Sequence, residues 1–505
     1  MAKIQLQPSG VVLEVPEGTD LRDCLFEHGL EFPCGGTGAC RGCLIRVNEG
    51  YLPITKSDIS NLDDEEINDG WRLACQASVQ GDLTLELPSI TMDILSDVHM
   101  VTNITSDAGL GIAIDIGTTT LAAQLVERSS LNVLGTATAL NPQGRFGADL
   151  MSRLDHALKS KKNSNTMARL IQDELYELII KVLPKGRESE LERITLVGNT
   201  AMHHLFAGLS VQSLAQFPFN PASLDSADFR SRDLGWNNIG NPTVSMLPNM
   251  GGFVGSDILA GILATGMHES LEQVALLDLG TNGEMVVGNR DGLICASAAA
   301  GPAFEGAGIG MGMSAVTGAV SEVFLENKEV RVHVLGGGSP RGICGSGLVD
   351  AVALGLDMGI IEHDGRLQAG DDWVLAAPLK LTQRDIREVQ LAKGAIGAGL
   401  RLLLKEAKLE MSDLKAVYLA GAFGNYIHAD KAQRMGLLEC SAEQIFPVGN
   451  SALRGAKLAL RAKSESELQS IRAMTSHIEL ATVPGFQDSF AAAMFFKDSR
   501  DLFNS

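Results

Sequence analysis

Polar and apolar residues alternate along the first 90 positions in short runs that predict β-strands. The first two runs are close enough in sequence to form a hairpin, and DLRDCLFEHG (20–29) predicts a short helix after them. Clear periodicity is lost after the last of these runs, from about Leu87, so we predict a first domain over residues 1–89 and a linker over 90–107. The alternating runs are KIQLQP (3–8), VVLEVPEG (11–18), CLIRV (43–47) and DLTLELP (82–88).

A different pattern follows the linker, where apolar runs end in Gly-Thr turns. GIAIDIGTTTLAAQLVE (111–127) predicts a strand, a turn and a second strand, and ALLDLGTNGEMVVG (275–288) predicts the same elements again. VGNTAMHHLF (197–206) and VGNSALRGAK (448–457) also recur in the same order. Two elements repeated in one order indicate an internal duplication and an α/β fold. The predicted lobes span residues 108–270 and 271–505.

Composition narrows the classes of function. Of the 505 residues, 45% are hydrophobic, and 41 Lys and Arg against 61 Asp and Glu give a formal net charge of −20. A negative charge of this size repels phosphate backbones and anionic lipid surfaces, so we expect no nucleic-acid partner and no membrane partner. The N-terminus lacks the features of a signal peptide, and no apolar run reaches about 18 residues, which predicts a cytoplasmic protein.

Four of the eight cysteines lie close together near the N-terminus, which indicates a metal site rather than a disulfide framework. Three are spaced C-x5-C-x2-C in FPCGGTGACRGCLIRV (32–47), and the fourth lies in WRLACQ (71–76). A [2Fe-2S] cluster needs thiolates and closely approaching backbone N–H groups, which glycines permit. The alternative, a four-cysteine zinc site, usually uses two C-x2-C pairs. The candidate thiolates are Cys34, Cys40, Cys43 and Cys75, among Gly35, Gly36, Gly38 and Gly42.

The repeated Asp and Gly-Thr turns predict a nucleotide site between the two lobes. Backbone N–H groups and hydroxyls at such turns can hydrogen-bond phosphate oxygens, and the Asp carboxylates can hold Mg²⁺ directly or through water. The alternative is two ordinary hairpins with glycine turns. A third element, VYLAGAFGNYI (417–427), leaves an apolar strand and can seat an adenine. The candidate residues are Asp115, Gly117, Thr118, Thr119 and Thr120 in the first turn and Asp278, Gly280, Thr281 and Asn282 in the second.

Several other sites are disfavoured by the residues themselves. No GxxxxGK[ST] motif is present, which argues against a P-loop ATPase, and GAGIGMG (306–312) follows PAFE rather than the strand that a dinucleotide loop needs. His203 and His204 are adjacent and would point in different directions on a helix, so we expect core or capping histidines rather than a shared metal. We expect the dispersed thiols to be buried; they are Cys24, Cys295, Cys344 and Cys440.

These motifs resemble two known folds. Residues 1 to about 90 resemble a plant- or adrenodoxin-type ferredoxin of β-grasp fold, in which the four clustered cysteines are the iron ligands and RLACQ (72–76) surrounds the last one. The remainder resembles the superfamily of acetate kinase, sugar kinases, actin and the actin-like heat-shock chaperones. This second resemblance implies a duplicated actin-like, ribonuclease H-like ATPase domain.

The superfamily resemblance also implies roles for individual residues. Asp115 and Asp278 would be the Mg²⁺-binding and water-orienting carboxylates, with Glu284 beside them as a catalytic residue. The two VGN segments would begin the helices that cross between the lobes. The nucleoside contacts would come from Gly421, Ala422, Phe423, Gly424 and Asn425.

The whole chain resembles the reductive activators of corrinoid proteins. That resemblance implies an ATP-hydrolysing iron-sulfur enzyme that delivers one low-potential electron and converts the Co(II) corrinoid of a methyltransferase system to Co(I). The implied partners are a corrinoid protein, an upstream electron donor and a second copy of this chain. The segments that carry the resemblance are NPQGRFGADLMSR (141–153), LVGNTAMHHLF (196–206), LPNMGGFVGSD (247–257), SAAAGPAFEGAGIGMGM (297–313), GICGSGLVD (342–350) and LAGAFGN (419–425).

Three alternatives belong to other functional classes: a small-molecule kinase with a ferredoxin appendage, a plain electron carrier, and an activator of another low-potential enzyme. A kinase has no need of the cysteines, and an electron carrier has no need of the two turns. The third class usually holds a [4Fe-4S] cluster between subunits, for which the ATPase region offers no suitable cysteine pair. The chain also lacks a D-x-H-x-x-G corrinoid motif, so we expect the corrinoid to belong to the partner.

Overall fold

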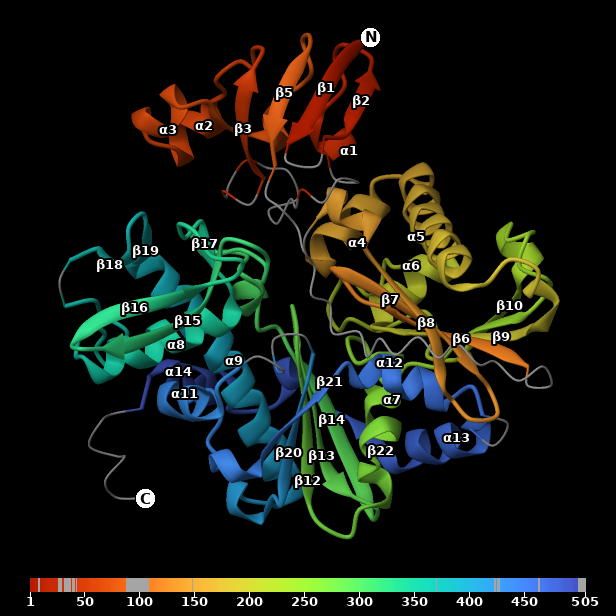
Figure 1. The fold of residues 1–505 in the computed structure, drawn as a ribbon. Helices are drawn as coiled ribbons and strands as arrows, with labels where there is room; N and C mark the ends of the chain where they lie inside the picture. The colour runs from red at the N-terminus through yellow and green to blue at the C-terminus, as the bar shows by residue number, and fades with distance from the viewer. Residues whose placement is uncertain are drawn as a thin grey trace.

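Figure 1 shows an N-terminal domain beside two larger lobes. The structure, a computed structural model, describes most of the chain. The predicted linker, most of the loop around Cys34 and Cys40, and part of the third glycine-rich element lie outside the described residues. The described residues are 1–7, 10–25, 30, 38, 41, 43–87, 109–147, 149–368, 370–421, 424, 427–461 and 464–497.

The N-terminal domain is built on a five-stranded sheet with the strand order β2-β1-β5-β3-β4. β1 forms an antiparallel hairpin with β2 and pairs in parallel with β5, so the predicted β-grasp arrangement is confirmed. Along β1, Ile4 and Leu6 alternate with exposed residues and are buried in the domain core. The elements are β1 (Ala2–Gln7), β2 (Val12–Val15), α1 (Leu21–Leu25), β3 (Leu44–Glu49), α2 (Lys56–Asn61), α3 (Asp64–Asn68), β4 (Trp71–Leu73) and β5 (Leu83–Glu86).

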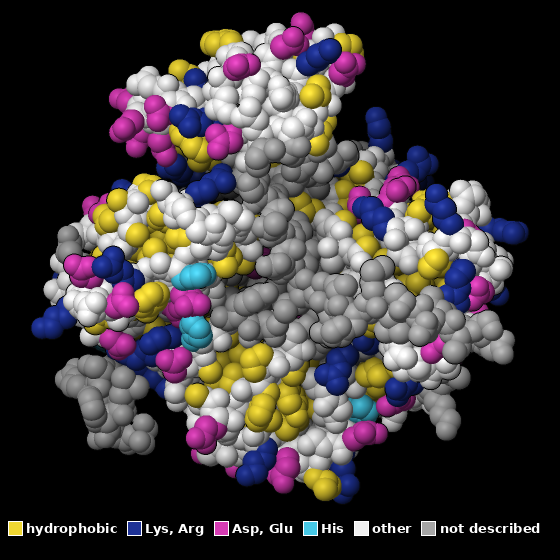
Figure 2. Space-filling model, in the orientation of Figure 1, with side chains coloured by type: hydrophobic (Ala, Val, Ile, Leu, Met, Phe, Trp, Pro, Cys, Tyr) yellow, Lys and Arg dark blue, Asp and Glu magenta, His cyan; other side chains and the backbone are white. Residues whose placement is uncertain are grey.

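Acidic side chains gather over α3 at one end of this domain (Figure 2). Asp63 caps α3, and the helix continues with Asp64, Glu65 and Glu66. Acidic residues in the first turn stabilise a helix by interacting with its positive N-terminal end. Only Glu66 among them is matched in an ion pair that the structure shows, with Arg41, so this end of the domain carries a negative surface.

The two lobes contain matching six-stranded sheets, ordered β10-β11-β9-β6-β7-β8 and β21-β20-β12-β13-β14-β22. In each sheet the first strand of the Gly-Thr hairpin runs antiparallel to its hairpin partner and parallel to a later strand on its other side. The duplication predicted from the repeated motifs is therefore present in the strand topology. The first-lobe strands are β6 (Leu110–Ile116), β7 (Thr120–Glu127), β8 (Val133–Leu140), β9 (Leu191–Gly198), β10 (Ala227–Arg230) and β11 (Thr243–Met246).

The second lobe carries an added β-layer outside its main sheet. β15, β16 and β17 form a three-stranded sheet in the order β16-β15-β17, and β18 pairs with β19. The main-sheet strands are β12 (Val274–Leu279), β13 (Gly283–Asn289), β14 (Gly292–Ala298), β20 (Ala416–Ala420), β21 (Ile445–Gly449) and β22 (Thr475–His477). The added strands are β15 (Ala319–Glu326), β16 (Glu329–Val334), β17 (Gly342–Ile343), β18 (Asp372–Ala376) and β19 (Leu379–Thr382).

Helices cover both sheets, and two of them pack between the lobes (Figure 1). α7 and α12 share one buried cluster with residues of β6 and β12, so they join the two sheets. The helices of the first lobe are α4 (Leu150–Leu158), α5 (Lys161–Val182), α6 (Thr200–Ala207) and α7 (Ser256–Thr265). Those of the second are α8 (Gly345–Asp357), α9 (Gln383–Ala407), α11 (Ala429–Met435), α12 (Ser451–Leu458), α13 (Ser464–Met474) and α14 (Phe486–Met494).

The helix that follows the first VGN segment does not cross between the lobes, contrary to the expectation from the sequence. α6 packs into the first-lobe core, where Met202, Leu205 and Phe206 are buried. Its counterpart α12 does reach across, but it packs against α7, at the start of which lies Asp257. The crossing pair is thus α7 and α12.

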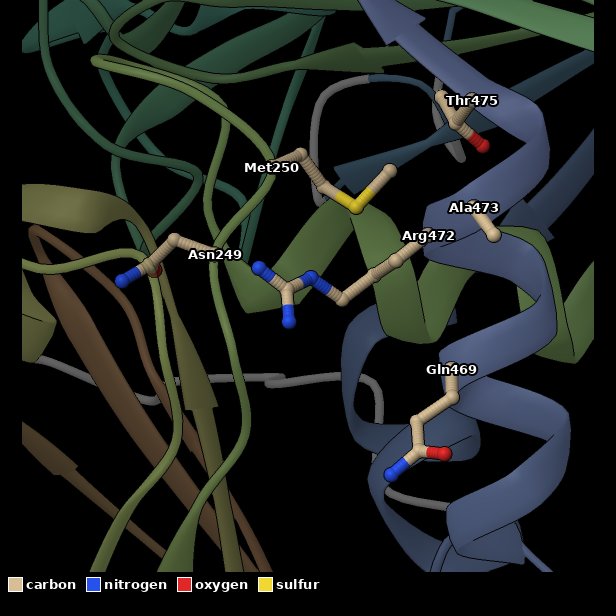
Figure 3. Close-up of a pocket in the computed structure, with 6 residues that line it drawn as sticks. All are labelled: Asn249, Met250, Gln469, Arg472, Ala473 and Thr475. Carbon is tan, nitrogen blue, oxygen red and sulfur yellow. The ribbon is translucent and has the colours of Figure 1, made fainter.

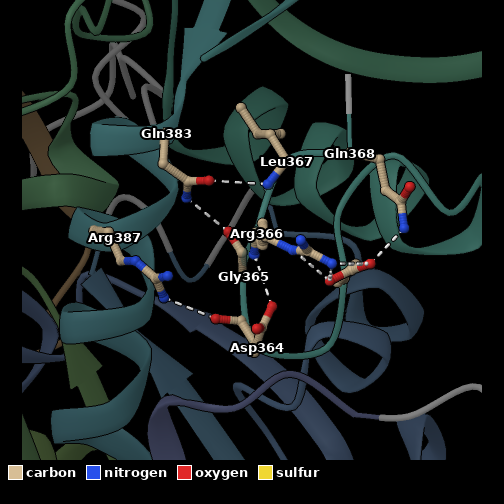
Figure 4. A network of polar contacts seen from close by, with 8 residues as sticks. Asp364, Gly365, Arg366, Leu367, Gln368, Gln383 and Arg387 are labelled. Carbon is tan, nitrogen blue, oxygen red and sulfur yellow. Dashed lines mark hydrogen bonds and ion pairs between the residues drawn. The ribbon is translucent and has the colours of Figure 1, made fainter. Parts of the chain in front are cut away.

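The first turns of α9 organise two loops of the second lobe. Asp385 accepts hydrogen bonds from the Thr382 hydroxyl and backbone, which begins the helix, and its other oxygen accepts from the Gly310 N–H at 2.6 Å. In the same part of the helix, Gln383 and Arg387 donate to backbone carbonyls of a loop containing Asp364 (Figure 4). Gly310 belongs to GAGIGMG, which follows a short 3₁₀ turn and leads to β15, so no dinucleotide-binding loop forms there.

Candidate functional site between the lobes

The first Gly-Thr turn is shaped by contacts from three other segments. The Gly117 N–H donates to the Thr120 carbonyl at 3.1 Å, and a Cβ at Gly117 would lie within 3.0 Å of that oxygen, so only glycine fits. The Asn141 side chain donates to the Gly117 carbonyl at 2.9 Å, and the Asn199 side chain donates to the Thr118 hydroxyl at 3.0 Å. The turn is therefore held in a fixed conformation with Asp115 at its start.

The second turn closes in the same way. The Gly280 N–H donates to the Asn282 carbonyl at 3.0 Å. The Thr281 hydroxyl donates to Glu305 at 2.6 Å. Glu305 lies in SAAAGPAFEGAGIGMGM, a segment that carries the family resemblance but for which the sequence predicted no role in this site. Register places Glu284 of β13 directly opposite Asp278 of β12, which puts both predicted carboxylates at the start of this hairpin.

Burial and mutual repulsion raise the pKa values of these carboxyl groups. The pKa of Asp278 is raised to about 7 by burial and then by the carboxylates of Asp115 and Glu305. Burial also raises the pKa of Asp115 to about 6, although a 2.8 Å hydrogen bond from Asn450 lowers it. The pKa of Glu284 lies well above its ordinary value because of burial and the neighbouring Asp257 and Asp278.

Asp257 is a fourth carboxylate of this site, and sequence reasoning missed it. The pKa of Asp257 is raised to about 8 by burial, then by Asp278 and Asp115, so it lies in the same electrostatic environment as the predicted residues. A Cβ at Gly255 would lie within 3.0 Å of the Gly198 carbonyl, and the Ser256 hydroxyl bonds to Gly198. These contacts attach the start of α7 to the end of β9. The available signal was a Gly-Ser-Asp at a helix start within LPNMGGFVGSD.

Four acidic groups in one buried place are unfavourable unless a cation or protons neutralise them. Mg²⁺ binds through few carboxylates together with phosphate oxygens and water, so this donor set fits a magnesium nucleotide. The arrangement can therefore position phosphates at the two turns and a metal between the carboxylates.

The third glycine-rich element lies against the second turn. After β20 the backbone turns at Gly421, where φ is +87°, and a Cβ there would lie 2.9 Å from Asp278 Oδ1 and 3.0 Å from the Leu279 carbonyl. Only glycine fits both the conformation and the close approach. Gly424 also lies in the structure, whereas Ala422, Phe423 and Asn425 lie outside the described residues.

Two of the four predicted cluster cysteines, Cys43 and Cys75, belong to the described residues, and their backbones lie close together. The Ala74 N–H donates to the Cys43 carbonyl at 3.0 Å, so Cys75, the next residue, follows directly beside Cys43. Gly38 takes a φ of +75°, and its carbonyl accepts a hydrogen bond from Asn61 at 3.0 Å, which fits a tightly wrapped loop. Cys34 and Cys40 lie outside the described residues.

The remaining sequence candidates have structural roles. His204 bonds through Nδ1 to the Thr200 carbonyl at 2.7 Å and through Nε2 to the Ala222 N–H at 3.1 Å, which leaves no nitrogen for a metal. His203 is fully buried beside it, and burial lowers the pKa of His203 to about 4. Cys295, Cys344 and Cys440 are buried, as expected, whereas Cys24 is only partly buried.

A separate cavity of about 330 Å³ opens between the lobes at α13 (Figure 3). Asn249, Met250, Gln469 and Arg472 are among its lining residues, and none of the predicted nucleotide residues lines it. The Leu224 carbonyl accepts from Arg472 at 3.3 Å and from the Asn249 backbone at 2.9 Å, so the guanidinium ties α13 to the first lobe.

Known protein families match the chain in three consecutive parts. The 2Fe-2S iron-sulfur cluster binding domain matches residues 4–80, the RACo middle region matches 110–270, and the C-terminal domain of RACo, the ASKHA domain, matches 272–505. These matches identify an N-terminal 2Fe-2S domain followed by an ATPase-type domain.

Individual relatives extend across these parts. The corrinoid activation enzyme RamQ of Eubacterium limosum is 36% identical over 421 residues, which cover 77% of this chain and 70% of that protein. The Co(II) methylated amine-specific corrinoid protein reductase of Methanosarcina barkeri is 28% identical over 426 residues, covering 76% of this chain and 77% of that protein.

A solved structure, named reductive activator for corrinoid,iron-sulfur protein, is similar over 98% of both chains, with a TM-score of 0.68 and 28% identity. Among the described residues, no helix combines the length and hydrophobicity needed to cross a membrane. The carboxylates between two duplicated lobes, the paired cysteines and the extent of these similarities agree, and the chain belongs to the family of corrinoid activation enzymes.

Proposed function

We propose that this chain uses ATP to reactivate a corrinoid protein of a methyltransferase system. One electron leaves the reduced [2Fe-2S] cluster and reduces the partner's Co(II) corrinoid to Co(I), and an upstream donor then returns one electron to the cluster. The observation that carries this proposal is the presence, in one chain, of a 2Fe-2S domain and a two-lobed site of converging carboxylates. The family relatives are named for the same kind of activation.

ATP supplies a driving force that the cluster alone does not have. Plant-type [2Fe-2S] clusters have potentials near about −400 mV. Transfer of one electron to an acceptor about 100 mV lower is unfavourable by about 2.3 kcal/mol. Nucleotide binding or hydrolysis can offset a gap of this size if it favours the state of the complex in which the electron moves.

The residues of the site between the lobes have different roles in binding and hydrolysing ATP. The backbone N–H groups of the two turns, with Thr118 and Thr281, hydrogen-bond the phosphate oxygens. Asp115 and Asp278 would hold Mg²⁺, directly or through water. Asp257 lies in the first turn of α7 and has a raised pKa, so we assign it the role of accepting the proton from the attacking water. Glu284 lies opposite Asp278 and completes the acidic group as a catalytic residue with a raised pKa.

The proposed function requires a corrinoid protein and an electron donor as partners. The corrinoid is carried by a separate protein, because this chain has no corrinoid motif of its own. The electron donor is a further protein or small reductant, and we expect the chain to pair as a homodimer in the cytoplasm. Sedimentation analysis of the purified protein tests the oligomeric state.

The decisive experiment follows cobalt by visible absorbance. Anaerobically reduced protein is mixed with a methyltransferase corrinoid protein in the Co(II) state, and Mg-ATP is then added. We expect Co(I) to appear only with ATP. Asp278→Asn should abolish ATP hydrolysis and Co(I) formation while leaving the visible spectrum of the cluster intact. Asp291→Asn is the matched control, because the Asp291 side chain is 82% exposed.

Three results would contradict the proposal. An unchanged cobalt spectrum across a panel of corrinoid proteins would remove the reductase function. ATP-dependent phosphorylation of a small molecule without any effect on cobalt would favour the kinase alternative. Loss of both hydrolysis and the cluster spectrum in Asp278→Asn would mean that the two sites do not belong to separate domains.

A further inference from the structure

One arginine in the first lobe is buried without a full set of partners. Arg153 of α4 is 1% exposed, and its Nε donates to the Gly147 carbonyl at 2.7 Å. Its Nη1 is buried and has no hydrogen-bond partner among the described residues. A buried guanidinium with an unpaired donor is strongly unfavourable, and an anion that binds there would compensate it.

The segment that carries Arg153 is attached to the first phosphate turn. Asn141 donates through its side chain to the Gly117 carbonyl at 2.9 Å, and its backbone N–H donates to the Thr119 carbonyl at 2.8 Å. Asn141 also caps the 3₁₀ turn Pro142–Phe146, which packs against α4. The position of α4, and of its arginine, is therefore fixed relative to that turn.

Arg153 also interacts electrostatically with Glu305, the carboxylate that binds the second turn. Burial lowers the pKa of Arg153 to about 10, and the carboxylates of Asp149 and Glu305 oppose this change. Glu305 accepts a hydrogen bond from the Thr281 hydroxyl at 2.6 Å. The guanidinium thus interacts with a residue in direct contact with one turn and is carried by a segment bonded to the other.

We propose that Arg153 binds the terminal phosphoryl group of the ATP held between the two turns. The direction of the nucleotide follows from the lobes that supply its contacts. The nucleoside element at Gly421 belongs to the second lobe, next to Asp278, so the phosphate chain runs from there toward the first lobe, where Arg153 lies. A planar guanidinium binds phosphoryl oxygens in a bidentate way, and the terminal group carries the most charge.

This assignment rests on the proposed nucleotide site and makes a specific claim about it: Arg153 distinguishes ATP from ADP. Substitution of Arg153 should therefore lower the affinity for the triphosphate more than the affinity for the diphosphate. We expect Arg153→Met to weaken binding of Mg-β,γ-imido-ATP by about 10- to 100-fold, the range for charge-assisted hydrogen bonds, and to change Mg-ADP affinity by less than about twofold. Arg153→Lys should fall between them, because a lysine keeps the charge but loses the bidentate geometry.

The test uses the full chain and measures both nucleotides by titration calorimetry, with inorganic phosphate added to the ADP arm. In the unsubstituted protein, phosphate should bind more tightly when ADP is present, and Arg153→Met should remove that effect. Arg169→Met, an exposed arginine on the neighbouring α5, is the control and should leave all affinities unchanged.

Thermal unfolding separates binding from a structural role. If Arg153 serves to bind phosphate, Arg153→Met should not lower the unfolding temperature of the nucleotide-free protein. Only the increase in unfolding temperature caused by imido-ATP should become smaller. A destabilised nucleotide-free protein with an unchanged preference for the triphosphate, in both variants, would show a structural arginine and overturn the inference. Equal losses for ADP and imido-ATP would overturn it too. Failure of the unsubstituted protein to bind either nucleotide would refute the proposed function itself.

Discussion

The contact between α7 and α12 fixes the geometry of the proposed nucleotide site, and one glycine makes that contact possible. A Cβ at Gly455 of α12 would lie within 3.0 Å of three backbone atoms of Ala260 in α7. Asn450, which bonds Asp115, caps α12, and Asp257 lies in the first turn of α7. Gly455→Ala therefore forces apart two helices whose first residues reach into the site.

The size of the effect follows from opposing contributions. Alanine in place of glycine favours a helix by about 1 kcal/mol. Overpacking costs about 1–3 kcal/mol, and the upper end applies here because the obstacle is backbone that cannot rotate away. The helices must separate by about 1.5 Å to bring the Ala260 carbonyl oxygen, which would lie 2.0 Å from the new Cβ, to a normal contact distance. Displacement of catalytic groups by about 1 Å can reduce a rate by about 100-fold.

We therefore expect Gly455→Ala to lower the apparent unfolding temperature by a few degrees and kcat for ATP hydrolysis by about 10- to 100-fold. Circular dichroism melting and a phosphate-release assay measure the two effects. Gly397→Ala in α9 is the control, because its Cβ would make an ordinary 3.6 Å contact with Ala493 and should leave both quantities unchanged or slightly raise the unfolding temperature. Normal stability and normal hydrolysis in Gly455→Ala would refute the close helix contact.

Two further predictions concern the cluster loop and the carboxylates. Gly38→Ala should impair iron-sulfur assembly, measured by visible absorbance, because Gly38 has a φ of +75° and its Cβ would collide with Ser57; Gly10→Ala, at +74° with open space around it, should assemble normally. The pKa of Asp278 is raised from 3.8 to about 7, so between these values the folded protein binds more protons than the unfolded one and loses stability as pH rises. We expect Mg²⁺ to replace those protons and therefore to raise the unfolding temperature more near about pH 8 than near about pH 6, and equal increments would contradict this account.

The parts of the fold that depend on local sequence patterns could be predicted. The hairpins at Asp115 and Asp278 could be predicted because an apolar run, a Gly-Thr turn and a second run follow one another within each segment. The duplication was visible for the same reason, since both copies keep their order. The C-x5-C-x2-C spacing likewise indicates the cluster loop within one short segment, whereas the fourth cysteine, Cys75, comes from a segment further along the chain.

What escaped prediction depends on segments that meet only in three dimensions. Asp257 looks like an ordinary acidic residue in the first turn of a helix, and only the folded chain brings it beside Asp278. The helix after Asn199 resembles its counterpart after Asn450 in sequence, but its apolar residues pack into the first lobe. Arg153 lies within NPQGRFGADLMSR, but its unpaired Nη1 is a property of the packed structure.

Coupling between ATP and electron delivery requires that nucleotide binding favour one arrangement of the N-terminal domain over another. Two adjacent residues of the chain contact the N-terminal domain and the first Gly-Thr turn, respectively. Leu140, the last residue of β8, packs against the hydrophobic core of the 2Fe-2S domain. Asn141, the next residue, bonds the carbonyl of Gly117 in the first phosphate turn. We expect a change in that turn on phosphate binding to reach the 2Fe-2S domain through this single peptide unit, without passing through the second lobe.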